Sequence, residues 1–315
     1  MAFGYRRWRT TRIAELESIG EVVETARGPV EFSRRGGSSY VVLFHGGPGG
    51  HDQSFAADPL VEAGFGNITP SRPGYLRTPL SVGRTFEEQA DAIAALLDTL
   101  KIGQVAVYGL SAGGPCAIQF AARHPDRTRV LLLACAVTQR YRPEIPAWAR
   151  ALFLSSMGTR LQLLMFDRFP ESSIQGLLRE ESTYSAKERT REAIRIARDP
   201  RLLGIARQLL KAFTPYDLRR AGLDNDLVQL AAIEHLPFEK IRCPTLIAHG
   251  TADGDAPFAD AEAARRHIRN AELYRMEGAW HLLNLSVGAD TLIARQVQFL
   301  KQHFAADVEP RETSA

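Results

Sequence analysis

The sequence has few cysteines and no long hydrophobic run. Cys116, Cys135 and Cys243 are the three cysteines among 315 residues. Their odd number, their wide spacing and the lack of a Cys-x-x-Cys pair argue against a disulfide framework and against a zinc site. No stretch approaches the roughly 18 consecutive apolar residues that a membrane-spanning helix needs, and no secretory signal sequence is recognisable. We therefore expect a cytoplasmic protein without a metal ion or a stable membrane anchor.

The chain also lacks an excess of charge of either sign. It has 39 Lys and Arg residues and 36 Asp and Glu residues, for a net charge of +3. This mild, interspersed charge argues against nucleic acid as a partner. The basic cluster Arg6–Arg9 is short, so we expect a solvated N-terminal arm over residues 1–19 rather than a lipid-binding site. Apolar residues make up 45% of the chain, enough to bury the core of one large domain with an insertion.

Short apolar runs alternate with helical patterns along most of the chain. The run Tyr40–Phe44 is unbroken and β-branched or aromatic, as in a strand buried on both faces. Thr85 and Glu88 form a capping box before a helical apolar stripe. This alternation predicts an α/β fold, with a parallel sheet and helices on both faces. The predicted core comprises residues 20–137 and 238–305; a helical insertion spans residues 138–237, and a polar, disordered tail spans residues 306–315.

One serine stands in a tight glycine frame. The segment Gly109-Leu110-Ser111-Ala112-Gly113 follows an apolar run and precedes a helix of small residues. The Gly-x-Ser-x-Gly pattern in this context is typical of a sharp turn that exposes a nucleophilic serine. Small residues at its borders let strand and helix pass closely, and the helix N-terminus supplies backbone N–H groups beneath the reacting centre. We therefore predict Ser111 as a nucleophile.

A nucleophilic serine needs a base, and the base needs an orienting carboxylate. Asp253 and Asp255 follow the strand-like segment 244–250, and His281 follows the next strand-like segment. Such positions meet at the carboxyl edge of a parallel sheet. Asp253 is predicted as the acid because it is nearer the strand end, whereas the alternative assigns the acid to Asp255 and lets Asp253 cap the turn. The glycine-rich segment 45–50, HGGPGG, brings backbone close to the serine, so the N–H groups of Gly47 and Ala112 are predicted as oxyanion donors.

Four motifs in this order, HGGPGG, GLSAGG, HGTAD and a final histidine after a glycine, resemble the serine-type α/β-hydrolase family over residues 20–305. The resemblance implies a mostly parallel eight-stranded sheet and a helical cap formed by the insertion. It also implies that Ser111, Asp253 and His281 are nucleophile, acid and base. This chain departs from the family pattern at two places. Ser71 stands before Arg72 where the family often has aspartate, and Trp280 precedes the histidine where a small residue is usual.

Substrate-binding residues are harder to predict from the sequence. An apolar stripe in the insertion is compatible with the core of the cap and with a substrate wall. Glu180 and Glu181 are expected to be solvated; the alternative is a pair of carboxylates that receives a substrate ammonium group. The predicted substrate-binding residues are Gly46, Leu110, Trp148, Phe153 and Trp280. The stripe consists of Trp148, Leu152, Phe153, Met157, Leu161, Leu164 and Met165.

The motifs favour a hydrolase of carboxylic esters that acts through an acyl-enzyme on a small apolar substrate, without a cofactor. Three alternatives stay open at this point. Proline iminopeptidases share the HGGPGG motif, so an aminopeptidase is one of them. A carbon–carbon bond hydrolase is another, and a non-enzymatic ligand receptor on the same fold is the third. The oligomeric state is not predicted by the sequence.

Overall fold

The apolar runs of the sequence form one eight-stranded sheet. A computed structural model describes residues 2–143 and 154–304, and its strand order is β1-β2-β4-β3-β5-β6-β7-β8. β1 pairs antiparallel with β2, and β2 with β4, whereas all other neighbours are parallel. The predicted fold class, a mostly parallel sheet with helices, is confirmed. The strands are β1 (Glu21–Thr25), β2 (Gly28–Gly36), β3 (Tyr40–Phe44), β4 (Gly66–Pro70), β5 (Val105–Leu110), β6 (Thr128–Ala134), β7 (Thr245–Gly250) and β8 (Ala271–Met276).

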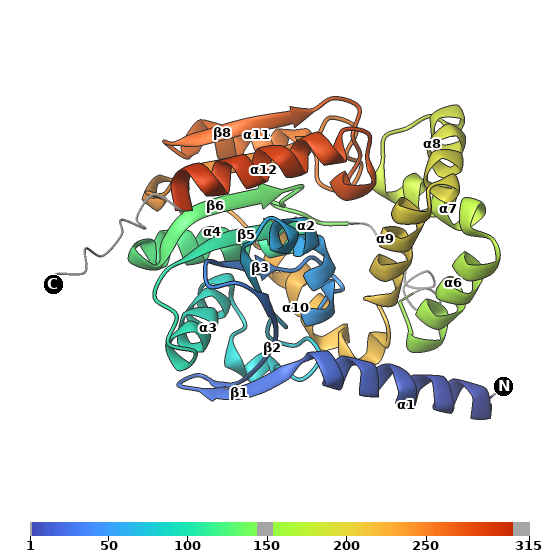
Figure 1. Ribbon diagram of the computed structural model, residues 1–315, viewed down its shortest axis with the longest axis horizontal. Coiled ribbons are helices and arrows are strands. Elements are labelled where there is room, and N and C mark those ends of the chain that lie inside the picture. Colours follow the sequence, from blue (N-terminus) through green and yellow to red (C-terminus); the bar gives the residue numbers. More distant parts are fainter. Residues whose placement is uncertain (1, 144–153, 305–315) are drawn as a thin grey trace, which may run out of the picture.

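Helices cover both faces of this sheet (Figure 1). One buried cluster joins the sheet to α3, α4 and α11, and a second joins its other face to α2 and α12. β3 is buried along its whole length because both of its faces are covered. The predicted capping box begins α3, where the Thr85 hydroxyl accepts from the Glu88 N–H and the Glu88 carboxylate accepts from the Thr85 N–H. These helices are α2 (Asp58–Glu62), α3 (Phe86–Thr99), α4 (Gly114–Arg123), α11 (Phe258–His267) and α12 (Ala289–Phe304).

The described part of the helical insertion lies between β6 and β7. Figure 1 shows α6, α7, α8 and α9 grouped at one side of the sheet. Of the predicted apolar stripe, Trp148, Leu152 and Phe153 lie outside the described residues. Met157, Leu161, Leu164 and Met165 are exposed, so for them both interpretations are wrong. α6 instead turns Leu163 and Phe166 inward. The helices are α6 (Ser156–Arg168), α7 (Pro170–Glu181), α8 (Ala186–Arg198), α9 (Pro200–Lys211) and α10 (Arg220–Ala231).

The N-terminal segment is a helix, α1 (Ala2–Ile19), rather than the solvated arm that we expected. Arg9 pairs with Asp217 at 2.5 Å. The buried Arg12 pairs with Asp52, which also pairs with Arg219 at 2.9 Å. Asp217 and Arg219 belong to the insertion, so ion pairs join α1 to it. The predicted tail, residues 306–315, lies outside the described residues.

Candidate active site

Ser111 lies at the sharp turn between β5 and α4. Its φ is 46°, in the left-handed region that residues with side chains rarely adopt. A Cβ atom added to Gly113 would lie 2.2 Å from the carbonyl oxygen of Phe44, and one added to Gly109 would lie 2.7 Å from Cβ of Ala117. Both glycines of the motif are therefore needed for the close passage of strand and helix. This passage holds Ser111 at the carboxyl edge of the sheet.

The structure brings Ser111, His281 and Asp253 together. Nε2 of His281 lies 3.0 Å from Oγ of Ser111, and Nδ1 of His281 lies 2.9 Å from Oδ2 of Asp253. The three residues follow β5, β8 and β7, which end at the same edge of the sheet. Both distances are within hydrogen-bond reach. The imidazole is thus placed between a hydroxyl and a carboxylate, the arrangement in which a histidine can take a proton from serine.

Asp253 has more hydrogen-bond partners than the histidine alone. Its Oδ1 accepts from the backbone N–H groups of Asp255 at 3.0 Å and Ala256 at 2.9 Å, and Nε2 of His249 lies 3.2 Å from its Oδ2. Burial would raise the pKa of Asp253, but the hydrogen bonds with His249 and His281 outweigh it and lower this pKa to about 2. Asp253 therefore stays charged while it caps the turn and orients His281.

Asp255 lies on the other side of the imidazole. Its Oδ2 is 3.5 Å from Nε2 of His281, the nitrogen that faces Ser111, and its Oδ1 accepts a hydrogen bond from the Tyr141 hydroxyl. A carboxylate beside Nε2 cannot hold the proton on Nδ1. The geometry therefore favours Asp253 over Asp255 as the orienting acid.

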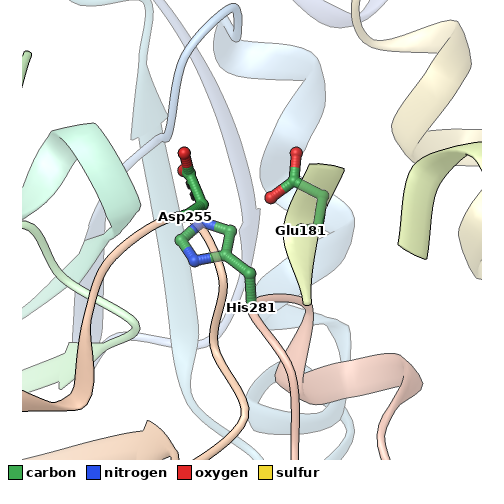
Figure 2. Close-up of side chains that lie close together, drawn as sticks. All are labelled: Glu181, Asp255 and His281. Carbon is green, nitrogen blue, oxygen red and sulfur yellow. Dashed lines mark ion pairs between the residues drawn. The ribbon is translucent and has the colours of Figure 1, made fainter. Parts of the chain in front are cut away.

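Glu181, at the end of α7, lines the pocket instead of being solvated as predicted. Figure 2 shows its carboxyl group and that of Asp255 grouped around the His281 ring. Burial raises the pKa of Glu181, and the nearby Asp255 and Asp253 raise it further against the attraction of His281, to about 7. Burial would lower the pKa of His281, but the hydrogen bond with Asp253 and the surrounding carboxylates raise it above its usual value. These neighbours stabilise the ring once it has taken up a proton.

The backbone at the end of α7 forms hydrogen bonds with the loops that carry Asp253 and His281. The Glu181 carbonyl oxygen accepts from the N–H groups of Gly254 and His281, each at 3.2 Å. Ser182 forms an isolated antiparallel bridge with Asp253. A Cβ atom on Gly254 would lie 2.7 Å from the backbone of Ser182, so this contact requires glycine. The insertion thus contacts the loops of Asp253 and His281 directly and places Glu181 beside His281.

The glycine-rich segment 45–50 is supported from behind by Arg72. The Arg72 N–H donates to Nε2 of His45 and its Nε–H donates to the His45 carbonyl oxygen, both at 3.0 Å. Its guanidinium group pairs with Asp226 of α10 at 2.5 and 2.8 Å. Arg72 therefore has an acidic partner in Asp226, although Ser71 stands where the family often has aspartate. The Gly46 N–H donates to Gln53 at 3.1 Å, whereas Gly47 lines the pocket beside Ser111.

A cavity of about 130 Å³ lies in front of Ser111 and His281. Gly46 and Leu110 line it as predicted, but Trp280 does not, because it is fully buried against Phe166 and other apolar residues beneath the insertion. Trp148 and Phe153 lie outside the described residues. The sequence prediction missed the wall supplied by the insertion, although the spacing of four in Ile205, Leu209 and Phe213 was a usable helical signal. The insertion residues that line the cavity are Leu177, Glu181, Ile205, Leu209 and Phe213.

Among the described residues, no helix combines the length and the apolar character needed to cross a membrane. Similarities to known proteins define the relationships of the chain. An uncharacterized hydrolase of Bacillus subtilis, YcgS, is 30% identical over 282 residues, which cover 84% of this chain and 92% of that protein. The pimeloyl-[acyl-carrier protein] methyl ester esterase of Aromatoleum aromaticum is 29% identical over 261 residues, which cover 80% of this chain and 95% of the esterase.

A solved structure and a family model also match the chain. An alpha/beta hydrolase fold protein from Nakamurella multipartita has a TM-score of 0.84 and 34% identity, covering 90% of this chain and 99% of that one. The model of the alpha/beta hydrolase fold family matches residues 40–286. The match spans the glycine-rich segment, the serine turn and the loops of Asp253 and His281. The chain belongs to the α/β-hydrolase-fold family.

Proposed function

We propose that this protein is a serine hydrolase that cleaves a carboxylic ester of a small, mainly apolar substrate. The observation that carries the proposal is the hydrogen-bonded series Ser111–His281–Asp253, with 3.0 Å and 2.9 Å between successive side chains, at the wall of a cavity. The similarity to an esterase that acts on a methyl ester supports the choice of bond.

In the proposed mechanism, Oγ of Ser111 attacks the ester carbonyl carbon while Nε2 of His281 takes the hydroxyl proton. Asp253 holds the other imidazole proton on Nδ1. The N–H groups of Gly47 and Ala112 donate to the oxyanion, and each donor is worth about 3 kcal/mol in the barrier. His281 returns its proton to the leaving alcohol. Water then attacks the acyl carbon while His281 takes its proton, and His281 gives this proton to Oγ of Ser111 as the acid leaves.

The cavity limits the size of the group next to the ester. Its volume of about 130 Å³ is near the roughly 150 Å³ that encloses a benzene molecule in a protein interior. Leu177, Ile205 and Leu209 make its insertion-facing wall apolar. We therefore expect short acyl groups, such as acetyl to butyryl, to be cleaved faster than long ones.

The test uses p-nitrophenyl esters of increasing chain length, proline p-nitroanilide and a vinylogous 1,5-diketone for carbon–carbon cleavage. We expect the wild type to cleave the short esters and Ser111→Ala to lose this activity, with an unchanged thermal unfolding curve as the control for folding. Cleavage of the anilide alone would point to an aminopeptidase, and cleavage of the diketone alone to a carbon–carbon hydrolase. Tight binding of a small molecule without turnover would contradict the proposal and point to a ligand receptor.

A further inference from the structure

Three side chains of types that can bind a metal ion lie close together beside the proposed nucleophile. Glu181, Asp255 and His281 each offer one ligand atom, and these atoms all lie within 4.8 Å of one another (Figure 2). The three residues come from the end of α7 and from the loops after β7 and β8, and all line the cavity. A small ion that enters the cavity can therefore reach all three.

The imidazole is oriented as in a metal site. Asp253 holds the Nδ1 side of His281 at 2.9 Å, which leaves Nε2 directed toward Ser111 and the two carboxyl groups; in the neutral ring, this atom carries the lone pair that can bind a metal ion. A carboxylate on the far nitrogen is the usual support of a metal-ligating histidine. Nε2 lies 3.5 Å from Oδ2 of Asp255, and two ligands of a tetrahedral zinc ion are about 3.4 Å apart. Two of the three ligands thus already have nearly the required separation.

The third ligand lacks a partner of its own. Oε2 of Glu181 is buried and has no hydrogen-bond partner among the described residues. A buried polar oxygen without a partner is unfavourable by a few kcal/mol, so most such atoms in proteins are satisfied. Asp255 uses Oδ1 for the Tyr141 hydroxyl and keeps Oδ2 toward the cavity. A dication would satisfy Oε2 and reduce the repulsion between the two carboxyl groups.

We propose that Glu181, Asp255 and His281 bind a divalent transition-metal ion of the zinc type, which competes with Ser111 for Nε2 of His281. Three protein ligands leave a fourth position open for water. The ion occupies the lone pair that would accept the serine proton, so its binding reversibly inhibits hydrolysis. The inhibition rests on the proposed function, whereas the binding does not.

The binding test is calorimetric titration of ZnCl₂ into chelator-treated full-length protein. We expect one ion per chain at this site in the wild type and in Ser111→Ala, which keeps all three ligands. Glu181→Gln or Asp255→Asn should weaken binding at least about tenfold, because each removes a charged ligand. Glu180→Gln is the matched control: Glu180 is exposed on the same helix, one residue away, and binding should be unchanged. Visible absorption of bound Co²⁺ should respond to the variants in the same way.

The outcomes separate the metal site from the hydrolase proposal. Absence of Zn²⁺ binding, or binding that neither Glu181→Gln nor Asp255→Asn weakens, would overturn the site; if one variant fails to fold, the other decides. Binding of a primary alkylammonium ion at these residues, without binding of Zn²⁺, would also overturn the metal site.

With p-nitrophenyl acetate as the substrate, the Zn²⁺ concentration for half inhibition should rise at least about tenfold in Glu181→Gln. Binding without inhibition of an active enzyme would overturn the competition at Nε2. Intact binding in a protein that cleaves no ester would support the site and overturn only the proposed function.

Discussion

The loops at the sheet edge and the helical insertion contribute differently to the same cavity. The loops contribute Ser111, Asp253 and His281, whose side chains contact one another in series. The described part of the insertion contributes an apolar wall and the carboxyl group of Glu181, whose Oε2 has no hydrogen-bond partner among the described residues. The side chains at the sheet edge are thus held by one another, whereas the hydrogen-bonding capacity of Glu181 Oε2 is unused among the described residues.

The pKa values of two carboxyl groups, Asp253 and Glu181, express this difference in numbers. Burial by itself would raise the pKa of both carboxyl groups. Asp253 accepts hydrogen bonds from two backbone N–H groups and contacts two histidines, and these contacts lower its pKa to about 2. Glu181 lies near other carboxylates, and its pKa rises to about 7. The hydrogen bonds of Asp253 therefore outweigh its burial, whereas burial and nearby carboxylates together raise the pKa of Glu181.

The largest expected effect comes from breaking the orienting contact at the sheet edge. Asp253→Asn should lower kcat for ester cleavage by on the order of 10⁴, because an amide does not hold the imidazole in the required tautomer. Asp255→Asn should lower kcat far less, since Asp255 does not contact Nδ1. Steady-state kinetics with p-nitrophenyl acetate measures both. Equal losses, or a larger loss for Asp255→Asn, would transfer the role of the acid to Asp255.

Local backbone signals explain why the sheet-edge residues were predictable. Gly109 and Gly113 are needed within two residues of Ser111, and this requirement is visible in the sequence as one short motif. Asp253 and His281 each follow a strand, and the order of parallel strands brings their ends together. The predicted positions of these three residues therefore depended on short-range patterns and on one rule of topology.

The insertion was less predictable because its contacts join distant parts of the chain. Arg72 and Asp226 are 154 residues apart, and no local pattern links them. In the sequence, Glu181 resembles a solvated residue beside Glu180. In the structure, its carbonyl oxygen accepts hydrogen bonds from the N–H groups of Gly254 and His281, which places it at the cavity. Trp280 precedes the histidine but points into the core beneath the insertion. In each case, tertiary packing decides which face of a helix or loop is buried.

The next largest effect tests the buried ion pair between the core and the insertion. Asp226→Asn should destabilise the protein by about 3–5 kcal/mol, because it leaves the buried Arg72 guanidinium without its counter-charge. The matched control is Asp167→Asn, which breaks the exposed pair with Arg207 and should cost at most about 1 kcal/mol. Urea unfolding measures both free energies. Similar losses for the two variants would show that Asp226 is not the main support of Arg72.

The free energy of unfolding, measured over a pH series, tests whether neighbouring groups lower the pKa of a buried carboxylate, Glu31. Burial would raise the pKa of Glu31, but His51 and Arg77 outweigh it and lower this pKa to about 2 from the usual 4.5. Glu31 also accepts from the Ser71 hydroxyl at 2.9 Å. A lowered folded-state pKa contributes stability above the unfolded pKa, and this stability is lost as the pH falls from about 4.5 toward 2.

The expected contribution of Glu31 at neutral pH is about 3 kcal/mol at most. Free energies of unfolding measured from pH 6 to the acid limit should therefore fall more steeply in the wild type than in Glu31→Gln. Glu88→Gln provides a comparison with a carboxylate at an exposed helix start. Parallel curves for the wild type and Glu31→Gln would contradict a lowered pKa at Glu31.

The smallest effect is expected on the outer face of α6, where the apolar stripe of the sequence meets solvent. The Leu161 side chain is 55% exposed, whereas Leu163, two residues away, is 3% exposed. Leu161→Gln should change the free energy of unfolding by less than about 0.5 kcal/mol, while Leu163→Ala should cost about 2–5 kcal/mol through the cavity that it leaves. Urea unfolding at one protein concentration measures the pair. A loss above 1 kcal/mol for Leu161→Gln would mean that this face is packed in solution, and the contrast between the two leucines would then no longer separate the buried side of the insertion from its surface.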